Sequence, residues 1–176
     1  MYYPILLSEY LILLLLNANL NSSRIPAMID PNARSKAISP FTFNVDKNKI
    51  RELCLAVGDN NPLFLDSSYA KKNGHKETPA PLTFGYSMLF WGFPQIWNVM
   101  EEIGLDLSKL LHVGQEYEYF HPIYPGDVID GFISIEEILS SQLLDKVVFK
   151  IVYKRNDLTV LIAKMKVMVV FERITG

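Results

Sequence analysis

The segment that most limits the fold of this chain is residues 82–93, which contain eight apolar or aromatic side chains and no charged one. A helix without a polar face has to be buried, so we predict a central, enclosed helix here. Pro94 follows directly, and proline ends or kinks a helix at that point. The rest of the chain must therefore supply a layer that wraps around this segment.

After a second amphipathic helix over residues 95–103, the chain alternates apolar and polar side chains with the two-residue period of β-strands. The predicted strands are residues 115–121, 128–138, 146–155 and 158–172. The turn sequence Pro125-Gly126-Asp127 separates the first two of these strands, and Asn156-Asp157 separates the last two. This order predicts an antiparallel meander, with Lys164 and Lys166 on its outer face.

The first half of the chain reads as one strand followed by helices. Residues 41–45 are rich in strand formers, and Asp46 can cap a helix that Gly58 ends. The predicted buried face of that helix, at helical spacing, is Ile50, Leu53, Cys54 and Val57. A short helix over residues 67–73 precedes Gly74. A strand, then helices, then several strands indicates an α+β fold.

Size and charge exclude several classes of function. The chain has 176 residues, the length of one domain. Its net charge of −2 gives no basic excess for nucleic-acid binding. One cysteine excludes a disulfide framework and a Cys-cluster zinc site, and three histidines argue against a His-rich metal site. We therefore expect a globular domain of a reduced compartment, the cytoplasm, with no metal or redox cofactor.

Residues 1–27 differ from the rest of the chain and are predicted to be an extension outside the fold. Their longest unbroken apolar run, residues 11–16, is far shorter than the roughly 20 residues of a membrane helix. No Lys or Arg precedes that run, as a secretory signal requires. A signal or anchor is the alternative. The predicted domain is residues 28–176, and Met28 would be a natural first residue for it.

Three stretches of the sequence, in this order and spacing, carry a resemblance to a known family. They are Gly58-Asp-Asn-Asn-Pro-Leu-Phe-Leu-Asp66, Pro79-Ala-Pro-Leu-Thr-Phe84 and Gln115-Glu-Tyr-Glu-Tyr-Phe-His-Pro-Ile-Tyr-Pro-Gly-Asp127. From about Ile29 onward the chain resembles the MaoC-like hot-dog hydratases and dehydratases, which act on acyl thioesters. The resemblance implies a single hot-dog fold, in which a curved antiparallel sheet wraps one long apolar helix.

Active members of that family carry the motif D-x-N-P-x-H, whose Asp and His handle the proton transfers. Asp59, Asn61 and Pro62 match the motif, but Phe64 occupies the His position. A phenyl ring cannot accept or donate a proton, and loss of a general acid–base group costs about 10²–10⁴-fold in rate. Asp59 and Asn61 are therefore candidate catalytic residues of an incomplete pair.

The sequence differs from active members of the family at a second place, the start of the apolar helix. Active members place a His-Gly pair there, and the Gly N–H helps to polarise the thioester carbonyl, a role that suits a helix N-terminus. Leu82 and Thr83 occupy the pair's positions, and a Cβ at Thr83 crowds the approach that Gly leaves open. Two losses at catalytic positions argue against a self-sufficient enzyme.

In this respect the chain resembles the non-catalytic, N-terminal half of two-part members. That resemblance implies a subunit of a (3R)-hydroxyacyl-thioester dehydratase, or 2-enoyl-thioester hydratase, that shapes the acyl site and needs a catalytic hot-dog partner. The expected substrate-binding residues are Phe64, Pro81, Leu82, Thr83 and Phe84. The expected ligand is an acyl-CoA or acyl-carrier-protein thioester. The expected assembly is a homodimer or a heterodimer, without nucleic acid and without a membrane span.

Each of these residues can also be interpreted as having a structural role alone. Asp59 and Asn61 suit an ordinary turn, and Phe64 and Phe84 suit core packing. His75 lies in a Lys-rich loop, residues 71–76, that is either solvated or meets the phosphates of coenzyme A or of a carrier's phosphopantetheine. His112 and Cys54 are read as structural. His121 is either a surface residue or a proton-transfer group.

Three alternative functions follow from these readings. A self-sufficient homodimeric enoyl-CoA hydratase would use Asp59 with a second group such as His121. A non-enzymatic acyl-thioester binder would use the hot-dog tunnel without chemistry. A thioesterase is a weaker alternative, because Asp59 is the only convincing base for activating a water molecule.

Overall fold

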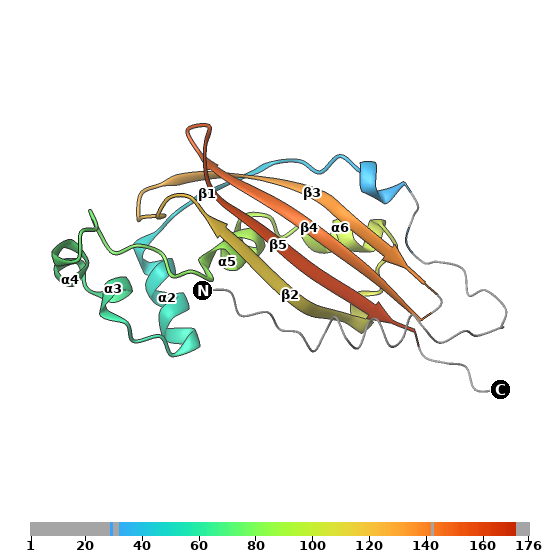
Figure 1. Ribbon diagram of the computed structural model, residues 1–176, viewed down its shortest axis with the longest axis horizontal. Helices are drawn as coiled ribbons and strands as arrows, with labels where there is room; N and C mark the ends of the chain where they lie inside the picture. Colours follow the sequence, from blue (N-terminus) through green and yellow to red (C-terminus); the bar gives the residue numbers. More distant parts are fainter. Residues whose placement is uncertain (1–28, 30–31, 142, 172–176) are drawn as a thin grey trace.

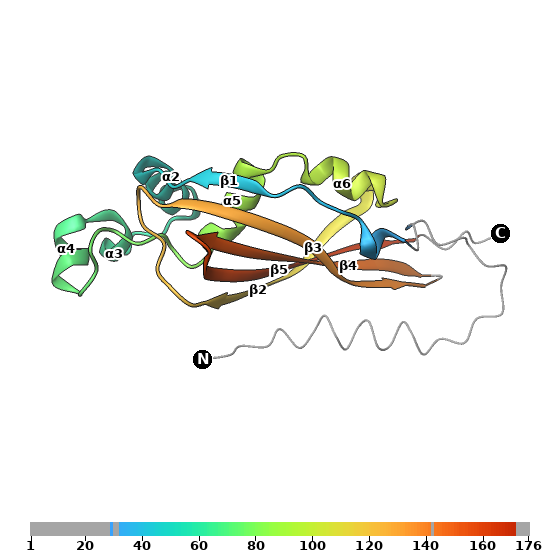
Figure 2. The same ribbon diagram turned by 90° about the horizontal axis from the view of Figure 1, so that it is seen from above.

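The computed structural model describes residue 29, residues 32–141 and residues 143–171, drawn in colour in Figure 1. The predicted extension, residues 1–27, and the last residue of the predicted fourth strand, Glu172, lie outside the described residues. The described part is one five-stranded antiparallel sheet with helices α5 and α6 on one of its sides (Figure 2). This is the α+β architecture predicted from the sequence.

The sheet has the strand order β1-β3-β4-β5-β2. The strands are β1 (Phe41–Asn44), β2 (Leu110–Tyr119), β3 (Val128–Ser140), β4 (Leu144–Arg155) and β5 (Leu158–Val170). The inner row predicted for β4 is buried: Val147, Phe149, Ile151 and Tyr153. On the outer face Lys164 pairs with Glu136 and Lys166 with Glu116.

The predicted meander is correct for β3, β4 and β5 and wrong for β2. Strand β2 pairs with β5 at the far edge of the sheet, not with β3, which follows it in sequence. It also begins at Leu110, five residues earlier than predicted. The register of the ladder shifts between His112 and Gly114, and one such irregularity breaks the two-residue alternation on which the prediction rested.

In the part of the chain that the structure describes, two 3₁₀ turns and five helices connect or cover the strands. They are η1 (Ala33–Ser35), α2 (Lys47–Val57), α3 (Pro62–Leu65), α4 (Ser67–Lys72), α5 (Phe84–Gly92), α6 (Ile96–Glu102) and η2 (Leu107–Lys109). The predicted ends of α2 are confirmed, since Asp46 accepts a hydrogen bond from the Asn48 N–H and Gly58 adopts a positive φ of 71°. Its buried face is narrower than predicted, because Val57 is 62% exposed.

Helix α5 is apolar all round, as predicted, but it is enclosed on one side only. Its inner side packs against the sheet, where Phe84, Met88 and Leu89 are fully buried. A Cβ at Gly85 would lie 2.6 Å from a methyl group of Leu161, so glycine permits this close approach of α5 to β5. On the other side Tyr86 and Phe90 are only half-buried, and Trp97 of α6, which contacts Phe90, is 42% exposed. The described chain therefore leaves an apolar helix face without cover.

Three tyrosine hydroxyls fix the start of α5 to the sheet. Tyr153 of β4 donates to the Gly85 carbonyl at 2.6 Å, Tyr117 of β2 lies 3.5 Å from the Thr83 carbonyl, and Tyr119 donates to the Leu82 carbonyl. Burial raises the pKa of Tyr117 to about 12 and holds the pKa values of Tyr119 and Tyr153 above the ordinary value. All three phenols therefore keep their protons at neutral pH and remain donors.

The segment before α5, residues 46–83, carries α2, α3 and α4 beyond one end of the sheet (Figure 1), and Glu77 ties it together. Its carboxylate accepts from the Thr78 N–H at 3.0 Å and lies 3.4 Å from the Lys47 ammonium. The hydrogen bond from the Ser67 hydroxyl, followed by that from Thr78, lowers the pKa of Glu77 to about 2.

Glu77→Gln is expected to lower the free energy of unfolding in a pH-dependent way. The pKa of Glu77 is lower in the folded chain than the ordinary 4.5. The stabilisation is therefore fully present above pH 4.5 and is lost as pH falls toward 2. Urea unfolding of both proteins between pH 7 and pH 2.5 measures this difference. A gap between them that stays constant over this range would show that the charge of Glu77 has no part in it.

Candidate functional site

A pocket of about 320 Å³ lies where segment 46–83 meets the end of β2. We call it the Phe64 pocket. Its walls are Leu63, Phe64, His75, Pro79, Ala80, Leu82, Tyr119, Phe120, His121, Pro122 and Ile123. Most of these side chains are apolar, and the polar side chains among them are those of His75, Tyr119 and His121. Of the residues predicted to bind substrate, Phe64 and Leu82 line this pocket.

The two catalytic candidates, Asp59 and Asn61, lie outside the walls of the pocket and build the turn that presents Phe64. The Asp59 carboxylate accepts the Asn61 N–H at 3.0 Å, and the Asn61 side chain accepts the Leu63 N–H at 3.0 Å, which caps α3. Pro62 then occupies the first turn of α3, where its missing N–H costs nothing. Helix α3 was not predicted, because four residues are too few for a periodic pattern.

The other predicted substrate-binding residues shape the start of α5 without lining the pocket. The Pro81 carbonyl accepts the Phe84 N–H at 2.9 Å, and Thr83 is the N-cap residue of α5, with an exposed side chain that makes no capping bond. The Phe84 ring is fully buried and packs edge-on against Phe43 and Trp91. In the described chain Phe84 is therefore a core residue.

Two histidines that are 46 positions apart in the sequence lie in the walls of the same pocket. His75 Nδ1 lies 3.1 Å from the Tyr124 hydroxyl. The His121 side chain is exposed, and no described residue hydrogen-bonds to its ring. The sequence pointed to each histidine separately. They share a pocket because the segment of residues 46–83 packs beside the residues that follow β2, which no local pattern reveals.

Asp127, the acid of the Pro-Gly-Asp turn, holds the loop that forms one side of the pocket. It is 8% exposed and lies 2.6 Å from an Arg155 guanidinium nitrogen, and its second contact is the Tyr124 N–H at 2.9 Å. The Lys76 ammonium lies 3.7 Å from the same carboxylate and 4.6 Å from the centre of the Tyr124 ring. This partly buried ion pair anchors residues 122–127 to Arg155, the last residue of β4.

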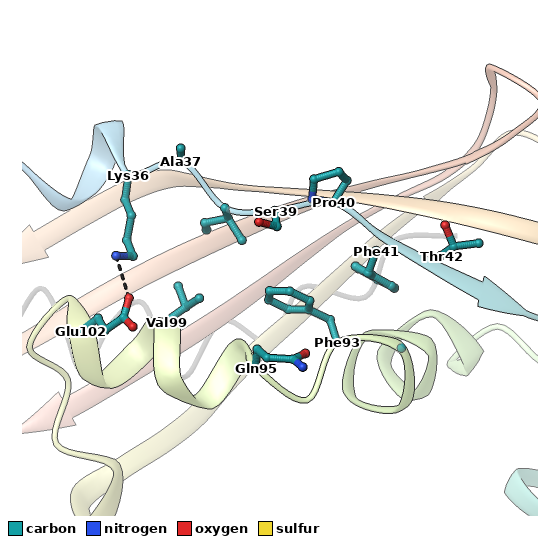
Figure 3. A pocket seen from close by; sticks show the side chains of 12 residues that line it. Lys36, Ala37, Ser39, Pro40, Phe41, Thr42, Phe93, Gln95, Val99 and Glu102 are labelled. Carbon is teal, nitrogen blue, oxygen red and sulfur yellow. Dashed lines mark ion pairs between the residues drawn. The ribbon is translucent and has the colours of Figure 1, made fainter.

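Two further hollows contain none of the predicted site residues. One, of about 600 Å³, lies between residues 36–42 and the α5–α6 region, and a Lys36–Glu102 ion pair of 2.8 Å crosses it (Figure 3). The other, of about 440 Å³, lies at the outer face of β2 and β5 beside Glu116, Glu118 and Lys164. The described residues include no group of three or more His, Cys, Asp or Glu placed to hold a metal ion. Within the same part of the chain, no helix is long and apolar enough to cross a bilayer.

Comparison with known proteins gives matches in both sequence and structure. Residues 34–160 match the family described as FAS1-like, dehydratase domain region. A UPF0336 protein from Streptomyces coelicolor is 38% identical over 98 residues. That alignment covers 56% of this chain and 65% of the relative, slightly less than two thirds of its length.

Two solved structures from Mycobacterium tuberculosis have the same fold. One is a C-terminally truncated HadBC complex, a (3R)-hydroxyacyl-ACP dehydratase, with a TM-score of 0.63 and 21% identity over 74% of this chain and 94% of that one. The other is the ChsH1-ChsH2 complex, with a TM-score of 0.63 and 17% identity over 78% of this chain and 86% of that one. At these identities the likeness shows the fold, and the predicted α+β hot-dog architecture is confirmed.

Proposed function

The chain belongs to the FAS1-like dehydratase domain region family, and from that premise we propose that it is the non-catalytic subunit of a (3R)-hydroxyacyl-thioester dehydratase. The observation that carries this proposal is the position of Phe64. It lines the pocket, together with Leu82, at the place where the family motif has its catalytic histidine.

The chemistry explains why this replacement matters. Dehydration of a 3-hydroxyacyl thioester removes a weakly acidic α-proton and expels the β-hydroxyl group as water, and hydration of the 2-enoyl thioester reverses both steps. Each step needs a group that takes or returns a proton. Phe64 and Leu82 offer none, and the Asp59 carboxylate accepts a backbone N–H of its own turn. The proton transfers are therefore assigned to a partner chain with an intact D-x-N-P-x-H motif.

The uncovered side of α5 and the edge strand beside it are the surface proposed for that partner. Among the described strands, β2 pairs only with β5, and no described strand covers its other edge. His112 of this strand stacks on Tyr86, with ring centroids 5.1 Å apart. The Tyr86 and Phe90 ring centroids are 4.7 Å apart, and those of Phe90 and Trp97 are 4.9 Å apart. We call these four side chains the aromatic row. It supplies an apolar wall for an acyl chain and a docking surface for a second hot-dog chain.

The relatives support a two-chain assembly. The HadBC and ChsH1-ChsH2 structures are both complexes. An open sheet edge next to an uncovered apolar helix face is also a surface that proteins normally pair or cover. The ligand of the assembly is proposed to be an acyl-CoA or acyl-carrier-protein thioester.

The test is hydration of crotonyl-CoA, followed as loss of enoyl-thioester absorbance. We expect no turnover above background by the purified chain, and turnover after mixing with a hot-dog chain that carries D-x-N-P-x-H. The control is Asp59→Asn, which should leave the rate of the mixture within about twofold, because Asp59 transfers no proton. Turnover by the chain alone that is lost in Asp59→Asn would instead establish a self-sufficient hydratase.

One observation favours that second candidate. His121 lines the same pocket as Phe64, so an imidazole is present near the position of the missing histidine. In a self-sufficient enzyme, His121→Gln would abolish the turnover of the purified chain. In the two-chain enzyme it would leave the rate of the mixture at saturating substrate unchanged.

A further inference from the structure

We propose that the Phe64 pocket is a non-catalytic binding site for the phosphopantetheine arm of an acyl thioester, with the phosphate held by Lys76, His75 and His121. The inference rests on the proposed function for the class of ligand. It goes beyond that function because it gives the pocket that lost its chemistry a separate role in binding.

The walls of the pocket suit the body of such a ligand. Ligand sites typically have volumes of about 300–1,000 Å³ and are mostly apolar with a few placed polar groups, and the Phe64 pocket has about 320 Å³. Its rim includes Leu82, 65% exposed, and Phe120, 46% exposed. Covering such large, exposed apolar side chains with a ligand is favourable in free energy, because it removes apolar surface from water. With Phe64 and Leu82 in place of proton-transfer groups, a bound thioester would remain unchanged.

The charges beside the pocket suit the head of the ligand. The Asp127 carboxylate is shared by Arg155, at 2.6 Å, and Lys76, at 3.7 Å. The Glu77 carboxylate is likewise shared by two lysines, Lys47 at 3.4 Å and Lys71 at 3.9 Å. These two clusters together hold four cations and two carboxylates, a net charge of +2, while the Asp59 and Asp66 carboxylates of the same segment accept backbone N–H groups. An anion placed here would complete this pairing.

Tyr124 positions two of the three donors, Lys76 and His75. The Lys76 ammonium is positioned by Asp127 and by the Tyr124 ring, and its side chain remains 64% exposed. The His75 ring is positioned by the Tyr124 hydroxyl, and His121 lines the same pocket as His75. Donors fixed in advance lose less conformational entropy on binding, and hydrogen bonds to a charged phosphate are stronger than neutral ones.

The same phosphate occurs in free coenzyme A and in the arm of a carrier protein. Isothermal titration of the purified full chain with 4′-phosphopantetheine, pantetheine and coenzyme A tests the site. We expect 4′-phosphopantetheine to bind at least about tenfold more tightly than pantetheine, because a charge-assisted hydrogen bond contributes more than the 1.4 kcal/mol that corresponds to tenfold. Equal affinity for coenzyme A and 4′-phosphopantetheine would identify the shared arm as the determinant, and tighter coenzyme A binding would add its nucleotide.

Two variants and one control locate the phosphate. Lys76→Gln and His121→Gln should each weaken 4′-phosphopantetheine binding about tenfold and leave pantetheine binding unchanged. His121 is exposed, so its replacement leaves the fold intact even if loss of Lys76 loosens the Asp127 cluster. Lys109→Gln removes an equivalent exposed positive charge in η2 and should change neither affinity.

The proposal is overturned if pantetheine and 4′-phosphopantetheine bind equally, if neither binds, or if Lys109→Gln weakens binding as much as Lys76→Gln does. These results are independent of the turnover assay. Phosphate-dependent binding without turnover in the mixture would contradict the proposed dehydratase role and leave the binding site standing. Turnover in the mixture without phosphate-dependent binding would contradict the binding site and leave the dehydratase role standing.

Discussion

Trp97→Glu is expected to weaken the association of this chain with its hot-dog partner about thirtyfold or more. Trp97 ends the aromatic row and is 42% exposed, so its ring is available to a partner. Tryptophans in the centre of an interface commonly contribute 2 kcal/mol or more, and about 2 kcal/mol corresponds to thirtyfold. A glutamate at the same place would also have to be buried without a counter-charge.

The substitution suits this test because the single chain should tolerate it. Trp97 lies in the first turn of α6, where a negative side chain interacts favourably with the helix dipole. Sedimentation velocity of the chain, alone and mixed with the partner, measures the association. Turnover of the mixture should fall in parallel at low concentration and recover at high concentration.

Trp91→Glu is the matched control. Trp91 has nearly the same exposure, 39%, but it lies on the other flank of α5, where it stacks on Phe43 and carries the Lys49 ammonium 4.8 Å above its ring. A glutamate there can pair with Lys49, and association should stay within about twofold. If both variants weaken association equally, the aromatic row is not the docking surface.

Gly131→Ala is expected to destabilise the fold by about 3 kcal/mol, or roughly 6–12 °C in Tm for a chain of this size. Gly131 of β3 lies directly opposite Phe41 of β1, and its missing side chain leaves room for the Phe41 ring. A Cβ added at Gly131 would come closer to that ring than the 3.0 Å that real Cβ atoms keep. The Phe41 ring has little room to move away, because two other rings pack against it. The Phe93 ring stacks on it with centroids 5.7 Å apart, and the Tyr153 ring packs edge-on with centroids 6.2 Å apart.

A double-mutant cycle separates this clash from a general weakness of the strand. Phe41→Leu shortens the opposing side chain, so it should cost much less in the Gly131→Ala background than in the wild type. Gly114→Ala is the control, because the nearest atom to a Cβ there is Cδ of the flexible Lys166 side chain at 3.2 Å. Urea unfolding of the variants gives the free energies. Strict additivity of the two substitutions would contradict the clash.

Much of the fold could be predicted because its signals are local. Asp46 and Gly58 mark the two ends of α2 through capping and a positive φ, which depend on neighbouring residues alone. Strands β3, β4 and β5 follow one another through short turns, so alternation and turn residues were sufficient. The place of β2 beside β5 is a long-range pairing, and its irregularity at residues 112–114 concealed its first half.

In the candidate site, too, the features set by local sequence could be predicted and those set by long-range packing could not. Phe64 and Leu82 were identified from a motif and do meet in one pocket. Phe84 was predicted from the same motif stretch as Leu82, with core packing as its alternative. The start of a helix turns successive side chains in different directions, and the Phe84 ring points into the core. The proximity of His75 and His121 depends on the packing of distant segments, and no spacing rule covers it.

The three tyrosine hydroxyls at the start of α5 have a mechanical consequence. Two of them come from β2, the open edge of the sheet, and they hold the carbonyls of Leu82 and Thr83. Leu82 is also the exposed lip of the Phe64 pocket. Any twist that a docked chain imposes on β2 is therefore transmitted through two rigid phenol rings to that lip. If docking on β2 alters how tightly the pocket binds its ligand, the ligand must alter the affinity of docking by the same factor, as thermodynamic linkage requires.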